Sequence, residues 1–308
     1  MTNVPRPFDS LRPHFSFSQL SMYLRCSMQY YFRYVLGLKE RPNLNLTRGK
    51  AGHTALELNA RYKIANEVDQ SAEEIIDIFS TEFGKGVAQL EPSDLAPDDN
   101  PGKEKDNTVE TLRLWRLRDA PKIQPHSVEL EFLIPIPATE DHHDEVKPIN
   151  GKIDLVSTRP VIMSPRGRPV RKLSVEDAKF PSRAPGNPLE LALLSDQLSL
   201  YDYVLTQAGK APEVIGFEHF IPPTKKNPAR VEFTARPPAA MKPAARAARH
   251  QRLLYKLRTA ARGIKAGIFL PTDDPKDCSW CGFRERCQVS LVKSDYEAMM
   301  IRAKTARE

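Results

Sequence analysis

Apolar residues recur every three or four positions through the first third of the chain, which is the spacing of an amphipathic helix. This pattern predicts four helices, over residues 16–38, 52–65, 71–83 and 109–119. Ser18 is a suitable N-cap for the first helix, and a loop rich in Pro, Asp, Asn and Gly occupies residues 91–107. The N-terminal part of the protein is therefore expected to be helical.

After residue 126 the pattern changes to alternation, which is typical of β-strands. In "VELEFLIPI" one face carries Val128, Leu130, Phe132, Ile134 and Ile136. Further strands are predicted over residues 151–158, 170–180, 214–221 and 229–235. A long amphipathic helix over residues 188–209, ending near Gly209, lies between the third and fourth of these five strands.

A basic helix from Ala244 to Ala266 follows the last strand, and its apolar side carries Leu253, Leu254, Leu257, Ala261 and Ile264. This order of elements predicts an α/β fold in which helices flank a mixed sheet. We expect a single domain across residues 1–308. It would have a helical part at 16–125, a core at 126–236, and a C-terminal part at 237–308 with the basic helix and three cysteines.

The composition is that of an ordinary globular protein, with 40% hydrophobic and 28% charged residues among 308. No apolar run approaches the ~20 residues that span a bilayer, and the N-terminus lacks the apolar segment of a signal peptide. We therefore expect a cytoplasmic protein with no membrane partner. The net charge is +7. The segment from Lys225 to Lys265 contains twelve Lys/Arg residues but only one acidic residue, Glu232. This favours a polyanionic partner, although a solvated basic face has the same composition.

The segment at residues 151–180, "GKIDLVSTRPVIMSPRGRPVRKLSVEDAKF", predicts a hairpin with two acidic residues side by side. "SPRG" suits a type I turn, with Pro165 second and Gly167 fourth. A hairpin folded about this turn pairs residues whose numbers sum to 331, which places Asp154 opposite Asp177. Cross-strand partners point to the same face, so the two carboxylates should lie close together.

Alternation along the third strand places Asp177 and Lys179 on one face and Glu176 on the other. Carboxylates brought together in this way suit a hard divalent cation such as Mg²⁺ or Mn²⁺. The lysine could then hold the attacking water and the scissile phosphate. A structural Asp–Lys ion pair at the edge of a sheet would have the same pattern, so both interpretations stay open on these residues alone.

Three further positions carry candidate chemistry. Gln197 and Tyr201 are four residues apart in the predicted helix and share a face. His53 lies after a glycine-rich turn at the predicted start of a helix, and imidazole is a common ligand of transition metals. Taken alone, each is more often structural. A weaker candidate for metal binding is the pair His142 and His143, in a loop between two predicted strands.

Taken in order, these signals resemble the PD-(D/E)xK nuclease superfamily and, within it, the RecB-like exonuclease branch. In that branch a histidine precedes the motifs G-x-x-D, (D/E)-x-K and Q-x-x-x-Y. The matching residues here are His53, Asp154 in "GKID", Asp177 and Lys179 in "DAK", and Gln197 and Tyr201 in "QLSLY". None of these motifs is specific alone, but their order over nearly the whole chain is. The resemblance implies a sheet like that of restriction endonucleases.

The four cysteines are distributed unevenly, with Cys26 near one end and Cys278, Cys281 and Cys287 near the other. Four thiolates suit either an iron–sulfur cluster or Zn²⁺, and the spacing alone favours neither. The sequence is similar to RecB-like nucleases of the CRISPR-associated and AddB types, in which one cysteine precedes the core and C-x2-C-x5-C follows it. This resemblance implies a 4Fe–4S cluster that fastens the two chain ends.

The resemblance also implies a metal-dependent DNA exonuclease, with His53, Asp154, Asp177 and the Ala178 carbonyl around a Mg²⁺ or Mn²⁺ ion. Lys179 would orient water and stabilise charge on the phosphate. Gln197 and Tyr201 would position Lys179 or the DNA strand, and the basic helix would follow the phosphate backbone.

Single-stranded DNA or an end-containing duplex is the expected partner, in recombination, repair, phage DNA metabolism or CRISPR adaptation. The host would be a bacterial, archaeal or phage-infected cell. An alternative is a DNA-end-binding subunit that is non-catalytic or active only with a helicase, recombinase or CRISPR integrase. The chain has no Walker-type G-x-x-x-x-G-K-[ST] motif, so it is not itself an ATP-driven helicase of that kind.

Overall fold

A computed structural model describes residues 13–40, 42–96, 98–137, 146–161, 168–272, 274–279 and 281–287 of the chain. The predicted turn "SPRG" and the pair His142 and His143 lie outside these residues. The chain forms two compact units, one made of residues 1–41, 133–151 and 254–308 and the other of residues 42–132 and 152–253. Within the described ranges, no helix combines the length and apolar character needed to cross a bilayer.

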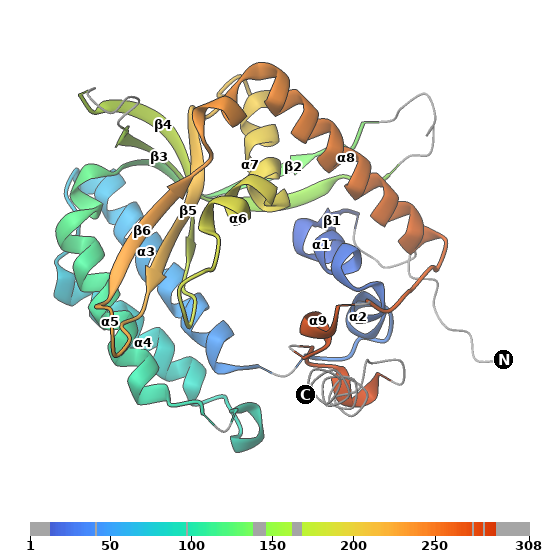
Figure 1. Ribbon diagram of the computed structural model, residues 1–308, viewed down its shortest axis with the longest axis horizontal. Helices are drawn as coiled ribbons and strands as arrows, with labels where there is room; N and C mark the ends of the chain where they lie inside the picture. The colour runs from blue at the N-terminus through green and yellow to red at the C-terminus, as the bar shows by residue number, and fades with distance from the viewer. Residues whose placement is uncertain are drawn as a thin grey trace, which may run out of the picture. The chain divides into compact units, whose positions relative to one another are not determined.

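A six-stranded mixed sheet runs through the fold in the order β1-β3-β4-β5-β6, with β2 also paired to β3 (Figure 1). β3 and β4 are antiparallel, β4 and β5 are parallel, and β5 and β6 are antiparallel. The strands are β1 (Phe15–Ser16), β2 (Gln124–Ile134), β3 (Ile149–Val161), β4 (Val170–Lys179), β5 (Val214–Ile221) and β6 (Arg230–Ala235). All five predicted strands are present, and the mixed α/β class is confirmed.

The β3–β4 register is the one that the sequence predicts. Leu155 pairs with Glu176 and Val161 with Val170, so every paired sum is 331. Asp154 and Asp177 are the next residues beyond the last pair. A register shifted by one residue would have turned one carboxylate to the opposite face of the sheet.

Helices are more numerous than the apolar pattern predicts. They are α1 (Phe17–Arg25), α2 (Ser27–Tyr30), α3 (Leu44–Asn66), α4 (Ala72–Val87), α5 (Pro101–Arg118), α6 (Pro188–Leu194), α7 (Asp196–Gln207), α8 (Pro243–Lys265) and α9 (Pro275–Ser279). A short π-helix (Tyr31–Val35) continues from α2. The basic helix has its predicted extent as α8, and all five residues predicted on its apolar side are buried.

The predicted helix over residues 16–38 is wrong in its continuity. Cys26 has an extended backbone, with φ −156° and ψ 104°, and separates α1 from α2. The N-cap of α1 is Ser16 rather than Ser18, and it forms a capping box with Gln19. The break therefore lies at the cysteine itself, which the apolar spacing around it does not reveal.

Other helix boundaries also differ from the predictions. α5 begins at Pro101, within the segment predicted as a loop, and not at residue 109. α3 begins after Asn43, whose side chain accepts a hydrogen bond from Leu46 N, so His53 lies inside this helix rather than at its start. The helix predicted over residues 188–209 is divided at Ser195, whose extended backbone ends α6 and whose hydroxyl caps α7. Serine competes with the helical backbone for hydrogen bonds, so it starts a new helix here.

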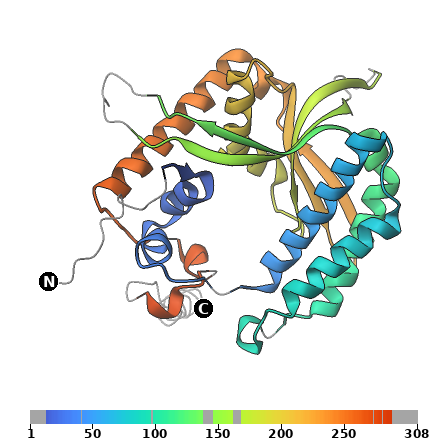
Figure 2. The same cartoon turned by 180° about the vertical axis from the view of Figure 1, so that it is seen from behind.

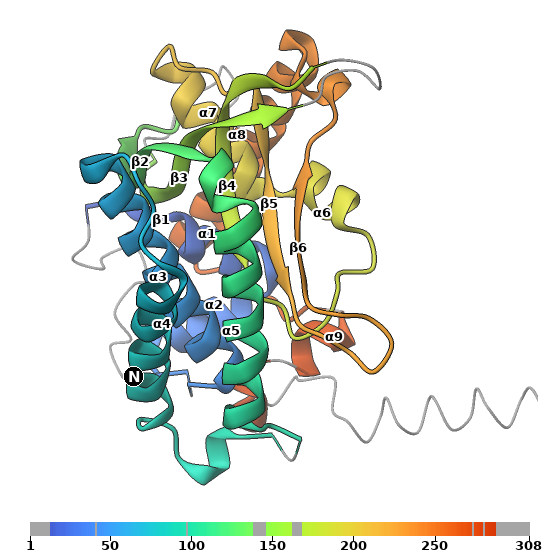
Figure 3. The same cartoon turned by 90° about the vertical axis from the view of Figure 1, so that its left-hand side faces the viewer.

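In the unit that contains most of the sheet, α3, α4 and α5 cover one face of the strands (Figure 2), and the sheet lies between them and α6 (Figure 3). The core under these helices joins residues of α3, α4 and α5 to residues of the sheet. They are Leu44, Ala51, Ala55, Ile75, Phe79, Phe83, Leu112, Trp115, Ala120, Phe180, Phe220 and Val231. α7 packs on β4 and β5.

A close approach between α3 and Phe180 fixes the place of His53. A Cβ atom on Gly52 would lie 2.4 Å from the Phe180 ring, so only glycine fits without displacing it. Arg48 Nη2 and Nε donate hydrogen bonds of 2.8 Å and 3.2 Å to the Phe180 carbonyl. His53 follows Gly52 in α3, and its ring lies edge-on to the Phe180 ring with the two ring centroids 5.9 Å apart. The helix thereby brings an imidazole to the end of β4.

Glu218 is a fully buried carboxyl group on β5. It accepts a hydrogen bond from Trp115 Nε1 at 2.9 Å and lies 3.5 Å from Arg159 Nη2. Burial, opposed by Arg159 and reinforced by the nearby Glu176 carboxylate, raises the pKa of Glu218 to about 7. The folded protein therefore binds this proton more tightly than the unfolded chain does.

We expect the free energy of unfolding to fall as the pH rises, because Glu218 loses its proton. Its stabilisation is complete below the ordinary pKa of 4.5 and is lost as the pH rises through about 7. Thermal melting across this interval should show the loss, and Glu218→Gln should flatten it. Glu213→Gln is the control, because Glu213 is exposed and pairs with Lys172 at the surface. An equal slope in Glu218→Gln and the parent protein would contradict the assignment.

In the other unit, the N-terminal helices are tied to the segment that precedes α9. The Leu270 carbonyl accepts hydrogen bonds from Ser27 Oγ at 2.9 Å and from Met28 N at 3.2 Å. The Tyr30 and Phe269 rings are stacked with their centroids 6.3 Å apart. These contacts join two regions of the chain that are about 240 residues apart in sequence and bring Cys26 to the C-terminal cysteines.

Candidate metal centre and cysteine site

Three side chains from three elements meet at one end of the sheet. His53 of α3, Asp154 of β3 and Asp177 of β4 each present a possible ligand atom, and these atoms lie within 4.8 Å of one another. His53 Nδ1 is 3.2 Å from Asp154 Oδ2. Imidazole and carboxylate donors in this arrangement suit a divalent cation such as Mg²⁺ or Mn²⁺. These are the three side chains that the motifs predict as metal ligands.

Asp177 provides the strongest indication that the site suits a cation. The side chain is fully buried, and neither carboxylate oxygen accepts a hydrogen bond of good geometry from the part of the chain that the structure describes. Lys179 Nζ is an ion-pair partner 2.7 Å from Oδ2, but it leaves the other oxygen unsatisfied. Burial raises the pKa of Asp177 to about 7, with Asp154 adding to the rise and Lys179 opposing it. A bound cation would satisfy this carboxylate, so the residues fit the metal.

His53 and Asp154, the two other members of the group, each shift the pKa of the other so that its charged form is favoured. Burial alone would lower the pKa of His53, but the hydrogen bond and charge of Asp154 outweigh it and raise the value. Burial alone would raise the pKa of Asp154, but His53, Asp177 and Lys179 lower it. His53 and Asp154 therefore stabilise each other as an ion pair while Asp177 is the strained member of the group.

A hydrogen-bonded chain links the lysine of β4 to the aspartate of β3. Lys179 Nζ donates to Gln197 Oε1 at 3.2 Å, Gln197 Nε2 donates to Tyr201 Oη at 2.9 Å, and Tyr201 Oη donates to Asp154 Oδ1 at 3.0 Å. The shared helical face predicted for Gln197 and Tyr201 is confirmed. Burial and the two aspartates raise the pKa of Tyr201, so its hydroxyl remains a proton donor.

Glu176 points away from this group, as strand alternation predicts. Its carboxylate accepts a hydrogen bond from Ser157 Oγ at 2.6 Å and pairs with Arg159 Nη1 at 2.9 Å. The Arg159 guanidinium also lies 3.6 Å from the centre of the Phe233 ring. Glu176 is therefore part of a buried structural network on the opposite face of β4.

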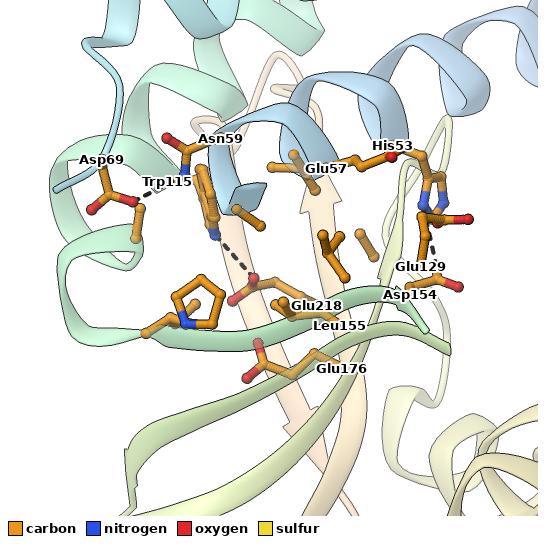
Figure 4. A pocket seen from close by; sticks show the side chains of 17 residues that line it. His53, Glu57, Asn59, Asp69, Trp115, Glu129, Asp154, Leu155, Glu176 and Glu218 are labelled. Carbon is orange, nitrogen blue, oxygen red and sulfur yellow. Dashed lines mark hydrogen bonds and ion pairs between the residues drawn. The ribbon is translucent and has the colours of Figure 1, made fainter. Parts of the chain in front are cut away.

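Glu129 is a residue of the site that the sequence pattern did not indicate. A pocket is lined by Glu129, His53 and Asp154, and Figure 4 shows these three side chains at one end of it. The Glu129 backbone is left-handed, with φ 50°, within strand β2. Burial and the carboxylates of Asp154 and Glu57 raise the pKa of Glu129. In "VELEFLI" the alternation places Glu129 on the polar face, so its position near the site depends on the tertiary fold.

A comparison with known families decides the identity. A family model described as the PD-(D/E)XK nuclease superfamily matches residues 14–288. The chain belongs to this superfamily. The match confirms the superfamily that the motifs predict, and its range includes the metal-ligand group and all four cysteines. No curated protein matches the chain.

Membership of the PD-(D/E)XK nuclease superfamily implies a nuclease that acts on nucleic acids and binds DNA. Enzymes of this superfamily generally use divalent metal ions, which agrees with the donor set of His53, Asp154 and Asp177. The six-stranded mixed sheet flanked by helices is also consistent with this superfamily.

The four cysteines line one small cavity in the unit that holds the N-terminal helices. Cys26 lies between α1 and α2, Cys278 lies in α9, and Cys281 and Cys287 follow it. None forms a disulfide. Burial raises the pKa of the Cys281 thiol, and the neighbouring Cys26, Glu40 and Cys287 add to this rise. A cation bound by the thiolates would reverse the effect, because metal coordination deprotonates thiols.

The basic helix α8 uses part of its charge inside the protein. Arg246 and His250 lie 3.1 Å and 3.3 Å from the carboxylate of Asp202, which is fully buried on α7, and Arg249 lies 3.8 Å from it. Arg258 is buried as well. Arg246, Arg249 and His250 therefore dock α8 on α7, and only the basic residues of α8 that are not buried can face a phosphate backbone.

Proposed function

We propose that this protein is a metal-dependent DNA exonuclease of the RecB-like branch, which hydrolyses phosphodiester bonds at DNA ends and prefers single strands. The observation that carries the proposal is the unsatisfied, buried carboxylate of Asp177 beside Asp154, His53 and Lys179. Two adjacent carboxylates are costly to bury unless a cation compensates their charge. Asp154 is paired with Tyr201 and His53, whereas Asp177 has only Lys179, so Asp177 Oδ1 is left without a donor among the described residues.

Each residue of the site has a role in this proposal. His53, Asp154, Asp177 and the Ala178 carbonyl would hold a Mg²⁺ or Mn²⁺ ion. When bound, the ion supplies Lewis-acid activation of water and of the phosphate. Lys179 orients the attacking water and stabilises charge on the phosphate, and Gln197 holds the ammonium group in place. Tyr201 restrains Asp154 through its hydroxyl.

Replacing Lys179 with alanine should lower the cleavage rate by about 10²–10³, the usual loss when one positioned transition-state contact is removed. Metal affinity should change little, because the three ligand side chains remain. Lys172→Ala is the matched control, since Lys172 is on the same strand but pairs with Glu213 at the surface. Cleavage by Lys179→Ala at the parent rate would refute the role of this lysine. For Tyr201→Ala we expect a smaller loss.

The exonuclease proposal is tested with end-labelled DNA. Linear single-stranded and double-stranded substrates are incubated with Mg²⁺ or Mn²⁺ beside circular single-stranded DNA of the same sequence. The expected result is metal-dependent release of short products from linear DNA, faster from single strands, with the circle intact. Cleavage of the circle would make the enzyme an endonuclease. Binding without cleavage under every condition would indicate a DNA-end-binding subunit that needs a helicase, recombinase or integrase partner.

The four cysteines support a second part of the proposal, a 4Fe–4S cluster that joins Cys26 to Cys278, Cys281 and Cys287. Four cysteines lining one cavity suit such a cluster, and Zn²⁺ is the alternative occupant. Its role would be structural, because these cysteines and the ligands His53, Asp154 and Asp177 belong to different compact units. Protein purified without oxygen should then be brown and contain about four irons.

A further inference from the structure

An open groove of about 800 Å³ begins at Lys179 and extends away from the metal-ligand group. One wall is the segment from Phe180 to Asn187, the other is α6, and Phe217 and His219 of β5 form the floor. This volume is within the range of small-ligand sites, which is enough for a nucleotide. Lys179 is thus shared between the groove and the proposed reaction centre.

His219 on the floor is a buried polar group without a partner. The side chain is 3% exposed, and Nδ1 makes no hydrogen bond among the described residues. His219 is the register partner of Lys179 on the adjacent parallel strand, so the two side chains share a face. A buried polar atom that lacks a partner costs free energy, and a ligand in the groove would supply one if the His219 ring rotates to expose Nδ1.

The wall formed by α6 is unusually apolar for a surface. Leu191 is 50% exposed and Leu194 is 66% exposed, and both line the groove. The opposite wall contributes Pro181, Pro185 and the exposed side chain of Arg183. A base can pack against apolar side chains, and a nearby cation can contact its phosphate, so this lining suits a nucleotide of a single strand.

We infer that this groove binds one nucleotide of the substrate strand, next to the phosphate that is cleaved. The base lies against Leu191 and Leu194, His219 Nδ1 forms a hydrogen bond with the nucleotide, and Arg183 contacts its phosphate. The inference rests on the proposed nuclease function, because Lys179 connects the groove to the reaction centre. It identifies α6 as the element that holds an unpaired base.

The test compares leucines on the same helix. Leu191→Ser and Leu194→Ser should each weaken binding of a fluorescent single-stranded oligonucleotide several-fold, because each removes apolar surface against which the base packs. Leu189→Ser is the matched control, because Leu189 is 44% exposed on α6 but does not line the groove. Binding is measured with Ca²⁺ in place of Mg²⁺. His219→Phe keeps an aromatic ring, removes the polar atoms, and should weaken binding several-fold with an unchanged melting temperature.

A second measurement ties the groove to one nucleotide. Oligonucleotides with an abasic site moved one position at a time are cleaved by the parent enzyme and by Leu194→Ser. The parent should slow about tenfold at one position, and Leu194→Ser should show no further loss there. If the parent enzyme is active but Leu194→Ser and Leu189→Ser cleave every oligonucleotide at equal rates, the proposed role of the groove is wrong and the proposed nuclease function still stands. A parent protein that cleaves no DNA would instead contradict the proposed function.

Discussion

Asp177→Asn should abolish metal-dependent DNA cleavage while DNA binding persists. Asparagine keeps the shape of the side chain but removes the charge that, together with Asp154 and His53, would hold the cation. The loss should exceed that of Lys179→Ala, because without the ion neither water nor phosphate is activated. The measurement is single-turnover cleavage of end-labelled DNA, beside calorimetric titration with Mn²⁺. Asp154→Asn should behave in the same way.

Glu176→Gln is the matched control for this prediction. It neutralises the adjacent carboxylate, which is equally buried but faces Ser157 and Arg159 on the other side of β4. Its expected effect is a lower melting temperature with cleavage largely retained, since a buried ion pair loses one partner. Active Asp177→Asn beside inactive, correctly folded Glu176→Gln would mean that the other face of β4 carries the chemistry.

Cys26→Ala should destabilise the protein severely and remove the colour expected of an iron–sulfur cluster. A cluster that joins Cys26 to Cys287 closes a loop of about 260 residues. A crosslink of that length restricts the unfolded chain by about 4–5 kcal/mol if the loop-entropy model for disulfides applies. Thermal melting, iron content and the absorbance near 400 nm are the measurements. Cys281→Ala should have the same effect.

Ser27→Ala controls for local packing beside Cys26. It removes the two hydrogen bonds that Ser27 Oγ makes, one donated to the Leu270 carbonyl and one accepted from Leu270 N, but leaves all four thiols in place, so it should cost only about 2 kcal/mol. Soluble Cys26→Ala protein should keep some cleavage activity, because its metal-ligand group belongs to the other compact unit. If the parent protein is colourless and contains one zinc per chain, the four cysteines bind zinc and not an iron–sulfur cluster. Parent protein that is fully stable without any metal would contradict both.

Local sequence determined the parts of this protein whose partners are close along the chain. The β3–β4 register is the one that the sequence predicts, and it places Asp154 next to Asp177. The Gln197–Tyr201 hydrogen bond follows from spacing of four residues on a helix. The opposite orientation of Glu176 follows from the period of two in a strand. Each depends only on backbone geometry within one helix, one strand or one pair of strands that are consecutive in sequence.

Tertiary structure decided everything that requires distant segments to meet. His53 reaches the carboxylates because Gly52 lets α3 approach Phe180, a contact between residues about 130 positions apart. Glu129 lies near the site, and its own backbone is left-handed within a strand whose sequence pattern is regular. The arginines of α8 turn inward because Asp202 is buried opposite them, which a count of basic residues does not reveal. The pKa of Asp177 likewise depends on burial and on charges that only the folded chain assembles, because desolvation and Coulomb energies are set by distance in space and not along the chain.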